Sequence, residues 1–457
     1  MSAVIAADPP ALSVSVPPYE RVVLDNGVTL LLMERREIPL VGFEAILRGG
    51  ALADPPGKSG AASVLAGLLE KGADERDAYE FADAVADVGG ALSAEAGLEG
   101  ISISGEFLAR DQDLMLELLA DLVQRPRLEA AEYEKLRERQ IELIRAAKDG
   151  DLSVLLPIYA AAELFRDHPY GRPVGGSERS LESLEHADVV RYYREHVGAD
   201  RLILAVTGDF DARTMRRALE QSFGDWRRAP APVPVAPPPE AVTGRRVLLV
   251  DAPTSVQTYF SIGNVGVART DARRAALDVV NTLFGGRFTS MLNSELRIRT
   301  GLTYGARSQL VRLTQSGPWQ IASFTQTEST EEAIDLALEV FARLKRGTID
   351  AAQLQSASTY VQGQFPTRLE TAAQWAAQLA ELEFYGLDRG YVENYGPALA
   401  AVSQEDAARM TADVYAADEN LVFTVIGDAR AIRDVVAKYG PVREMPLTAP
   451  VFSPNGE

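Results

Sequence analysis

Short apolar runs separated by turn residues open the chain. The segments 21–24 and 28–32 flank Asp25-Asn26-Gly27, which supplies the positive-φ residues of a tight turn, so the pattern predicts a β-hairpin. A third strand is predicted over 40–47. Farther on, the pattern predicts strands over 91–96, 101–107 and 202–206, and helices that begin near residue 77 and cover 111–123, 130–148, 155–165, 188–196 and 211–223.

The segment 56–72 is small or apolar at nearly every position, which is typical of a helix that is buried on most sides. Ser59 is the expected N-cap, because its hydroxyl can accept an N–H of the first turn. Gly72 is the expected end, because glycine readily adopts the left-handed conformation that stops a helix. The sequence therefore predicts a core helix with close neighbours.

Prolines mark a boundary near the middle of the chain. Six of the ten residues 230–239 are proline, which favours an extended linker and excludes a helix. After this linker, the pattern predicts strands over 246–250, 257–265, 303–313, 319–325 and 421–425, and helices over 272–284, 289–299, 330–344, 350–365, 371–384, 404–414 and 429–439.

One segment recurs after about half the chain. Residues 201–209 match residues 420–428, and each copy lies between two predicted helices, which indicates a duplicated domain. Because strands and helices come in runs rather than in strict alternation, the predicted class is α+β. We expect homologous domains over 19–228 and 245–450, each a mostly antiparallel sheet packed with helices, and a Pro-rich linker over 229–244.

Composition excludes several classes of function. The chain has 457 residues and a net charge of −19, with no basic stripe to neutralise phosphates, so no nucleic-acid partner is expected. The acidic charge fits a preference for basic substrates. The absence of cysteine excludes disulfides and thiolate zinc sites. No apolar run approaches the roughly 20 residues of a membrane span, so none is expected.

The first eighteen residues, Met1 to Pro18, are small and rich in alanine and proline. They lack the basic start of a signal peptide. Their composition resembles the loose leader of a mature secreted chain, so we expect a periplasmic location, with the cytoplasm as the alternative.

The flanks of the predicted helix over 56–72 resemble the zinc-site helix of a known family. The resemblance is carried by Gly-Lys-Ser-Gly at 57–60 and Lys-Gly at 71–72, and the family is that of the pitrilysin/insulinase-type metallopeptidases, which include the mitochondrial processing peptidases. In that family the helix carries the motif H-x-x-E-H, whose histidines bind zinc. The resemblance places Ser63, Ala66 and Gly67 at the three motif positions.

The family's third zinc ligand is a glutamate farther along the chain, and the corresponding position here is Leu143. Glu142 is adjacent, but one residue is about 100° around a helix, so its carboxylate is expected to face elsewhere. All the ligand positions and the general base are therefore replaced. We expect this chain to bind no metal and no other cofactor.

The three histidines do not suggest a second metal site. His186 and His196 are predicted near the two ends of one helix, about 15 Å apart, so they cannot share a metal ion. His168 lies in a His-Pro-Tyr-Gly turn that the family also carries. We interpret all three as surface or capping residues.

The segment 293–304 resembles a second motif of the same family, L-R-x-x-x-G-L-x-Y, which lies in its C-terminal half. Arg297 and Tyr304 occupy the Arg and Tyr positions, Gly301 is expected to end the helix, and Tyr304 to begin the next strand. Taken alone, the two residues are typical of an exposed helical arginine and a half-buried strand tyrosine. The resemblance implies that they hold substrate, since guanidinium and phenol groups both donate to a peptide carbonyl or an oxyanion.

Two further segments are interpreted as structural. Residues 285–290, Gly-Gly-Arg-Phe-Thr-Ser, lack the ending of a phosphate-binding loop and are expected to connect two helices. Residues 89–96 resemble the family's G-G-x-x-N-A strand, whose edge lies near the active site, but Ser93 replaces the Asn and Glu95 replaces a common aromatic residue. A simple core strand is the interpretation we favour, although its backbone can pair with an extended peptide.

The resemblance implies a non-catalytic subunit of a heterodimeric zinc metallopeptidase. A homologous partner subunit is expected to hold the zinc, while this chain contributes Arg297 and Tyr304 and forms half of a chamber for peptides or unfolded polypeptides. The alternative is a structural or peptide-binding scaffold with no peptidase role, as some relatives serve in respiratory complexes. A neighbouring gene that encodes H-x-x-E-H favours the heterodimer.

Overall fold

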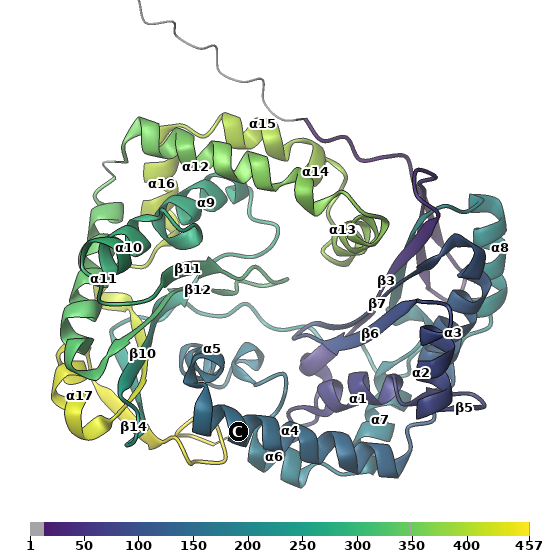
Figure 1. Cartoon of the computed structure of the whole chain (residues 1–457), viewed down its shortest axis with the longest axis horizontal. Helices are drawn as coiled ribbons and strands as arrows, with labels where there is room; N and C mark the ends of the chain where they lie inside the picture. Colours follow the sequence, from purple (N-terminus) through teal and green to yellow (C-terminus); the bar gives the residue numbers. More distant parts are fainter. Residues whose placement is uncertain (1–12, 348, 457) are drawn as a thin grey trace, which may run out of the picture.

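The computed structural model describes residues 13–347 and 349–456 and confirms the α+β class. Its two six-stranded sheets, one from each half of the chain, lie at opposite sides of the molecule (Figure 1). In sheet order, the first consists of β1 (Glu20–Val23), β2 (Thr29–Glu34), β8 (Leu202–Gly208), β3 (Leu40–Arg48), β7 (Gly100–Leu108) and β6 (Ala91–Ala96). The second consists of β11 (Ala306–Leu310), β12 (Pro318–Gln326), β10 (Gln257–Val265), β13 (Val422–Gly427), β9 (Arg246–Asp251) and β14 (Val442–Pro446).

The repeated sequence segment forms equivalent strands of the two sheets. β8 pairs antiparallel with β3 and parallel with β2, and β13 pairs in the same way with β10 and β9. Every residue of β8 and β13 is buried, which explains why the repeat is apolar almost throughout. The sheets differ at one edge, where β1 runs antiparallel to its neighbour and β14 runs parallel. A short hairpin, β4 (Gly72–Ala73) and β5 (Arg76–Asp77), follows the first helix.

Helices follow the predicted segments closely and cover the sheets (Figure 1). In the first half they are α1 (Ala61–Leu69), α2 (Ala78–Ala86), α3 (Gln112–Gln124), α4 (Ala130–Gly150), α5 (Leu152–Phe165), α6 (Glu178–Ser183), α7 (His186–His196) and α8 (Ala212–Phe223). In the second half they are α9 (Arg274–Asn281), α10 (Met291–Asn293), α11 (Thr330–Lys345), α12 (Ala351–Gln364), α13 (Ala372–Phe384), α14 (Gly390–Glu393), α15 (Tyr395–Ala400), α16 (Gln404–Val414) and α17 (Ala429–Val436). Two π-helical turns cover Thr282–Gly286 and Ser294–Arg299.

The two halves exchange one helix each. α5, from the first half, packs on β10 and β13 of the second sheet, and α13, from the second half, packs on β3 and β8 of the first sheet. Gly42 of β3 permits the second contact, because a Cβ at that position would lie 2.7 Å from the backbone nitrogen of Ala373. The exchange places the inner faces of both sheets against helices that are distant in sequence. The predicted boundaries 19–228, 229–244 and 245–450 stay a prediction.

Two hairpins join the halves near the centre of the molecule. Glu99, between β6 and β7, accepts hydrogen bonds from the backbone N–H of Thr314, between β11 and β12, at 3.2 and 3.0 Å. The hydroxyl of Tyr170 donates to Glu99 at 2.6 Å and accepts from the N–H of Gln315 at 3.1 Å. The tyrosine of the His-Pro-Tyr-Gly turn therefore links the two hairpins.

The N-terminal segment is packed rather than loose from residue 13 onward, which differs from the expectation for Met1 to Pro18. Val16 is buried in the core of the second half, its N–H donates to Glu393 at 3.1 Å, and its carbonyl accepts from Arg389 at 2.8 Å. Residues 1–12 lie outside the described part, and the periplasmic location stays a prediction. Within the described residues, none of the helices combines the length and the apolar character that crossing a membrane requires.

Candidate functional site

Asp54, and not Ser59, caps helix α1. Its carboxylate accepts hydrogen bonds from the N–H groups of Gly60 and Ala62, both at 2.8 Å, whereas the predicted cap makes no such bond. Gly60 occupies the N-cap position with φ of 99°, a conformation that suits glycine. The helix ends at Leu69, three residues before the predicted stop, and Gly72 lies with positive φ in β4.

The motif positions of α1 do not fit a zinc ion. The hydroxyl of Ser63 accepts a hydrogen bond from the side-chain amide of Gln140 on α4 at 2.7 Å, and Ala66 is buried. A Cβ at Gly67 would lie 3.3 Å from the side chain of Leu136, so α4 leaves no room there for an imidazole unless that leucine moves. A hydroxyl and a hydrogen atom stand at the two positions where zinc requires imidazole ligands, and a methyl group stands at the position of the general base.

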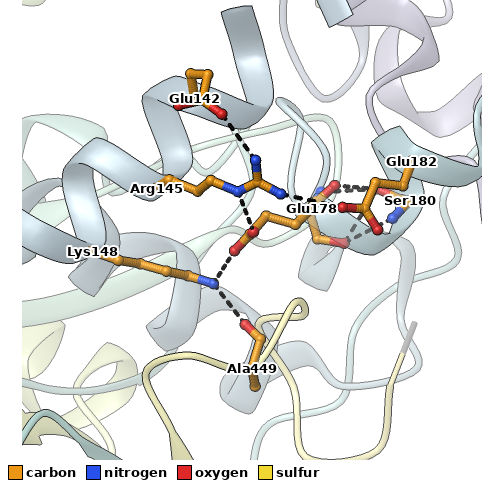
Figure 2. A network of polar contacts seen from close by, with 8 residues as sticks. Glu142, Arg145, Lys148, Glu178, Ser180, Glu182 and Ala449 are labelled. Atoms are coloured by element: carbon orange, nitrogen blue, oxygen red, sulfur yellow. Dashed lines mark hydrogen bonds and ion pairs between the residues drawn. The ribbon is translucent and has the colours of Figure 1, made fainter. Parts of the chain in front are cut away.

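The third ligand position also lacks a donor. Leu143 on α4 is 60% exposed and borders an apolar cavity of about 460 Å³ between α4, α5 and the turn near Tyr170. Figure 2 shows that the neighbouring Glu142 instead pairs with Arg145, at 2.9 Å. The carboxylate nearest to the ligand position is thus engaged in an ion pair, as the 100° offset on the helix predicts.

The ion pair of Glu142 belongs to a larger network on the outer side of α4 (Figure 2). Arg145 pairs with Glu178 at 3.0 Å, and Lys148 pairs with Glu178 and donates to the carbonyl of Ala449 at 2.6 Å. Burial alone raises the pKa of Glu178, but the hydrogen bonds from Lys148 and Arg145 hold that pKa below its usual value. The network fastens the C-terminal segment to α4 and has a structural role.

No other group of three histidine, aspartate, glutamate or cysteine side chains in the described residues is arranged to hold a metal ion. Each histidine has local partners. The ring of His168 contacts the carbonyl of Pro237 at 2.8 Å, the ring of His186 contacts the carbonyl of Leu128 at 2.6 Å, and His196 packs on the ring of Tyr192. The two ends of α7 hold His186 and His196, as the sequence predicts.

The structure brings Arg297 and Tyr304 together in the second half. Arg297 lies on the π-helical turn, with its guanidinium carbon 4.4 Å from the ring centre of Tyr304 and 4.8 Å from that of Phe288. Tyr304 is 75% exposed and Phe288 is 59% exposed. Gly301 ends the helical segment with φ of 70°, but the next strand begins at Ala306, so Tyr304 lies in the loop before it. Phe288 was not among the site residues expected from the sequence.

A cavity of about 570 Å³ is lined by neighbours of the Arg–Tyr pair and not by the pair itself. Phe288 and Gly305 line it together with residues of α5, β10 and β12. The segment 285–290 connects two helices, as predicted. It also shapes this cavity, because Gly285, Gly286 and Phe288 form part of the cavity wall. The apolar cavity beside Leu143 lies against other residues of α5, and the two cavities share no lining residue. Within one chain, α5 therefore lies between this cavity and the replaced zinc-ligand position Leu143.

Strand β6 is the edge strand of its sheet and not a core strand, which corrects the interpretation of residues 89–96. Its outer edge is occupied in part, because the backbone N–H of Ala94 donates to the carboxylate of Glu70 at 2.6 Å. Glu70 follows the last residue of α1. A peptide that pairs with this edge has to displace the Glu70 side chain.

An acidic cleft of about 590 Å³ lies between the first sheet and α13. Four glutamates line it, namely Glu44, Glu95, Glu99 and Glu381, with Arg368 at one side. Burial raises the pKa of Glu44 to about 7. The acidic lining of the cleft suits a basic ligand.

Glutamine in place of Glu44 is expected to remove a pH dependence of stability. Because the pKa of Glu44 is raised on folding, the folded chain binds this proton more tightly than the unfolded chain, and stability falls as pH rises from about 4.5 to about 7. The change in the free energy of unfolding that Glu44→Gln causes should therefore be about 1–2 kcal/mol more stabilising at pH 8 than at pH 5. Urea unfolding at both pH values measures this. Glu95→Gln, at an exposed position of the same cleft, is the control and should show no such difference.

A duplicated α+β chain with replaced zinc positions and an exposed Arg–Tyr pair defines a metallopeptidase-like protein without its own metal site. Two models of one family match it, that of insulinase (peptidase family M16) over residues 43–178 and that of the peptidase M16 inactive domain over residues 183–360. The chain belongs to peptidase family M16, as a non-catalytic member in which the H-x-x-E-H motif is replaced.

Relatives agree with the assignment to this family, and solved structures agree with the fold. The chain is 28% identical over 393 residues to an uncharacterized zinc protease of Mycobacterium tuberculosis, covering 85% of this chain and 86% of the relative. It is 25% identical over 429 residues to one of Streptomyces coelicolor, covering 91% and 92%. A peptidase M16 inactive domain from Pseudomonas fluorescens has the same fold, with a TM-score of 0.83 and 21% identity, over 94% of this chain and 99% of that structure. A Helicobacter pylori protease also has a TM-score of 0.83, with 20% identity, over 90% and 99%.

Proposed function

We propose that this chain is the non-catalytic subunit of a heterodimeric zinc metallopeptidase. A homologous partner supplies H-x-x-E-H, the distal glutamate and the zinc, and this chain supplies Arg297 and Tyr304 and half of a chamber that encloses peptides. The observation that carries the proposal is an asymmetry between the halves. The residues at the replaced zinc positions pack against or bond to other side chains of this chain, whereas Arg297 and Tyr304 contact each other and Tyr304 is exposed.

The chemistry of the pair suits a site completed by another chain. Stacking between two aromatic rings holds the Arg297 guanidinium in place without using its N–H groups, so these remain free to donate. Arginine keeps its charge at every physiological pH, and the phenol of Tyr304 adds a neutral donor. Together they can hold a peptide carbonyl and stabilise the negative charge that develops on its oxygen.

Peptides or unfolded polypeptides are the proposed substrates. The chamber that two such chains enclose has the acidic cleft on its wall, and the cleft favours basic side chains. The Arg–Tyr cavity and the cleft both lie between the two sheets, so one extended chain can contact both.

The scaffold alternative has one observation in its favour. Glu70 occupies the N–H of Ala94 on the edge strand, where a bound peptide otherwise adds a strand. A scaffold needs no open edge, and it needs no exposed Arg–Tyr pair either. The pair therefore favours the heterodimer.

Co-expression with the homologous chain that carries H-x-x-E-H tests the proposal. Size-exclusion chromatography should show one complex that contains both chains, and metal analysis should find one zinc per complex and none in this chain alone. A stable homodimer of this chain that does not bind the partner supports the scaffold alternative instead.

A further inference from the structure

A basic pocket lies in the second half of this acidic chain. The cavity has a volume of about 480 Å³, and we call it the arginine pocket. Its charged lining residues are four arginines and two carboxylates, namely Arg269, Arg274, Arg312, Arg368, Asp278 and Glu381. The pocket thus carries two excess positive charges in a chain whose net charge is −19. Such a local reversal of charge calls for a physical explanation.

The carboxylates in the pocket are already engaged. Asp278 accepts from the guanidinium of Arg312 and from the hydroxyl of Tyr395, both at 2.6 Å, and lies 3.8 Å from Arg274. Glu381 pairs with Arg269. A single aspartate therefore serves two arginines, and the exposed Arg368 adds a further positive charge at the pocket wall.

Arg274 is held rigidly at the pocket wall. Its guanidinium carbon lies 3.7 Å from the ring centres of both Tyr391 and Tyr395, and it donates to the carbonyl of Tyr391 at 2.6 Å. Its side chain is only 16% exposed, so the guanidinium is poorly solvated, and this burial lowers the pKa of Arg274. Positive charge in such an environment attracts an anion more strongly than the same charge in water does.

Several buried donors of the pocket have no partner among the described residues. They are Nη1 of Arg312, Nε of Arg269 and the hydroxyl of Tyr391. An unsatisfied buried donor is costly, so such groups usually have an acceptor that completes them. The three residues come from separate segments and all line the arginine pocket, so together they are suited to an anion with more than one acceptor oxygen.

The arginine pocket adjoins both features of the proposed chamber. It shares Gly286 and Tyr360 with the cavity beside Arg297 and Tyr304, and it shares Arg368 and Glu381 with the acidic cleft. Of the helices that form it, α9 and α12 lie side by side in the upper part of Figure 1, and α13 lies to their right, beside the first sheet. A group bound here is therefore within reach of a peptide held at the Arg–Tyr pair.

We propose that the arginine pocket binds a carboxylate of a peptide enclosed in the chamber, with Arg312, Arg269 and Tyr391 as donors. The inference rests on the proposed function, because it takes the ligand to be a peptide. The planar fork of a guanidinium matches the two oxygens of a carboxylate. The carboxylate comes either from the C-terminus of the peptide or from an acidic side chain. The pocket then binds a negatively charged group of the peptide and the acidic cleft binds a positively charged group, and together they fix the orientation of the peptide.

Isothermal titration calorimetry on the full chain without a partner tests this with one nonapeptide in three forms. These are the free C-terminal acid, the C-terminal amide, and the amide with an internal Gln→Glu change. The free acid or the Glu form should bind about tenfold more tightly than the plain amide, the gain expected of charged hydrogen bonds. A preference for the free acid assigns the pocket to the C-terminus, and a preference for the Glu form assigns it to a side chain.

Protein variants locate the effect. Arg312→Gln should abolish the preference for the carboxylate, and the exposed Arg368→Gln should reduce it without affecting folding. Arg213→Gln, an equal charge change at an exposed position of α8, should leave it intact. Equal binding of all three peptide forms, a preference that survives both pocket variants, or binding of inorganic phosphate alone overturns the proposal. Because no partner or activity is involved, these results are independent of whether the heterodimer forms.

Discussion

Alanine in place of Arg297 should lower kcat/KM of the reconstituted heterodimer by about 100-fold, the loss typical of one oxyanion-stabilising donor. Tyr304→Phe removes only the hydroxyl and should lower it by at least about tenfold. The fall should be mainly in kcat, because the pair is proposed to act on charge that develops in the transition state. Steady-state kinetics on the purified complex measure both values.

The controls separate chemistry from assembly. Arg299 lies two residues away, is exposed and pairs with Glu295, so Arg299→Ala should change kcat/KM by less than about threefold. Neither the Arg297 nor the Tyr304 variant should dissociate the complex in size-exclusion chromatography. Unchanged kinetics in both variants would reduce the pair to a packing contact.

Gly42→Ala should destabilise the chain by about 3 kcal/mol, at the upper end of the cost of overpacking. The added Cβ would lie 2.7 Å from the backbone nitrogen and 2.8 Å from the Cα of Ala373, and backbone atoms cannot rotate away as a side chain can. The change should lift α13 from the first sheet and loosen the contact between the two halves. Urea unfolding followed by circular dichroism measures the loss.

Gly363 provides the matched control for this substitution. It lies within α12, and a Cβ there would meet nothing within 4 Å. Gly363→Ala should therefore stabilise the chain by up to about 1 kcal/mol, through helix propensity. A Gly42→Ala variant as stable as the native chain would show that α13 does not need the close contact.

The order of the elements could be predicted from the sequence because it is encoded locally. A helix begins near residue 77 as predicted, with a capping box of Asp77 and Glu80, and the hairpin turns at Asp25-Asn26-Gly27. The repeated strand revealed the duplication, because its place in the centre of each sheet requires an apolar run in both copies.

The exchange of α5 and α13 could not be predicted in this way. A helix that is apolar on most faces indicates burial but not the sheet that buries it. The decisive features are long-range, such as the close approach of Ala373 to Gly42. The sequence marks that approach only by a glycine within a predicted strand.

The candidate site was predicted in part. The resemblance to the family's motif singled out Arg297 and Tyr304 together, and the structure places the guanidinium carbon 4.4 Å from the tyrosine ring centre. Phe288 was missed, because an aromatic residue after a glycine pair carries no signal of stacking. Asp54 and Glu70 were also missed, since each acts on backbone N–H groups that only the folded chain brings near. Their roles depend on tertiary contacts and not on local patterns.

Peptide cleavage should be measured with three samples: this chain alone, the H-x-x-E-H partner alone, and the equimolar mixture. We expect no activity from this chain, little from the partner, and strong activity from the mixture that chelation of zinc abolishes. Activity of this chain alone that survives removal of metal and of any partner would contradict the account. A partner as active alone as in the mixture would contradict it equally.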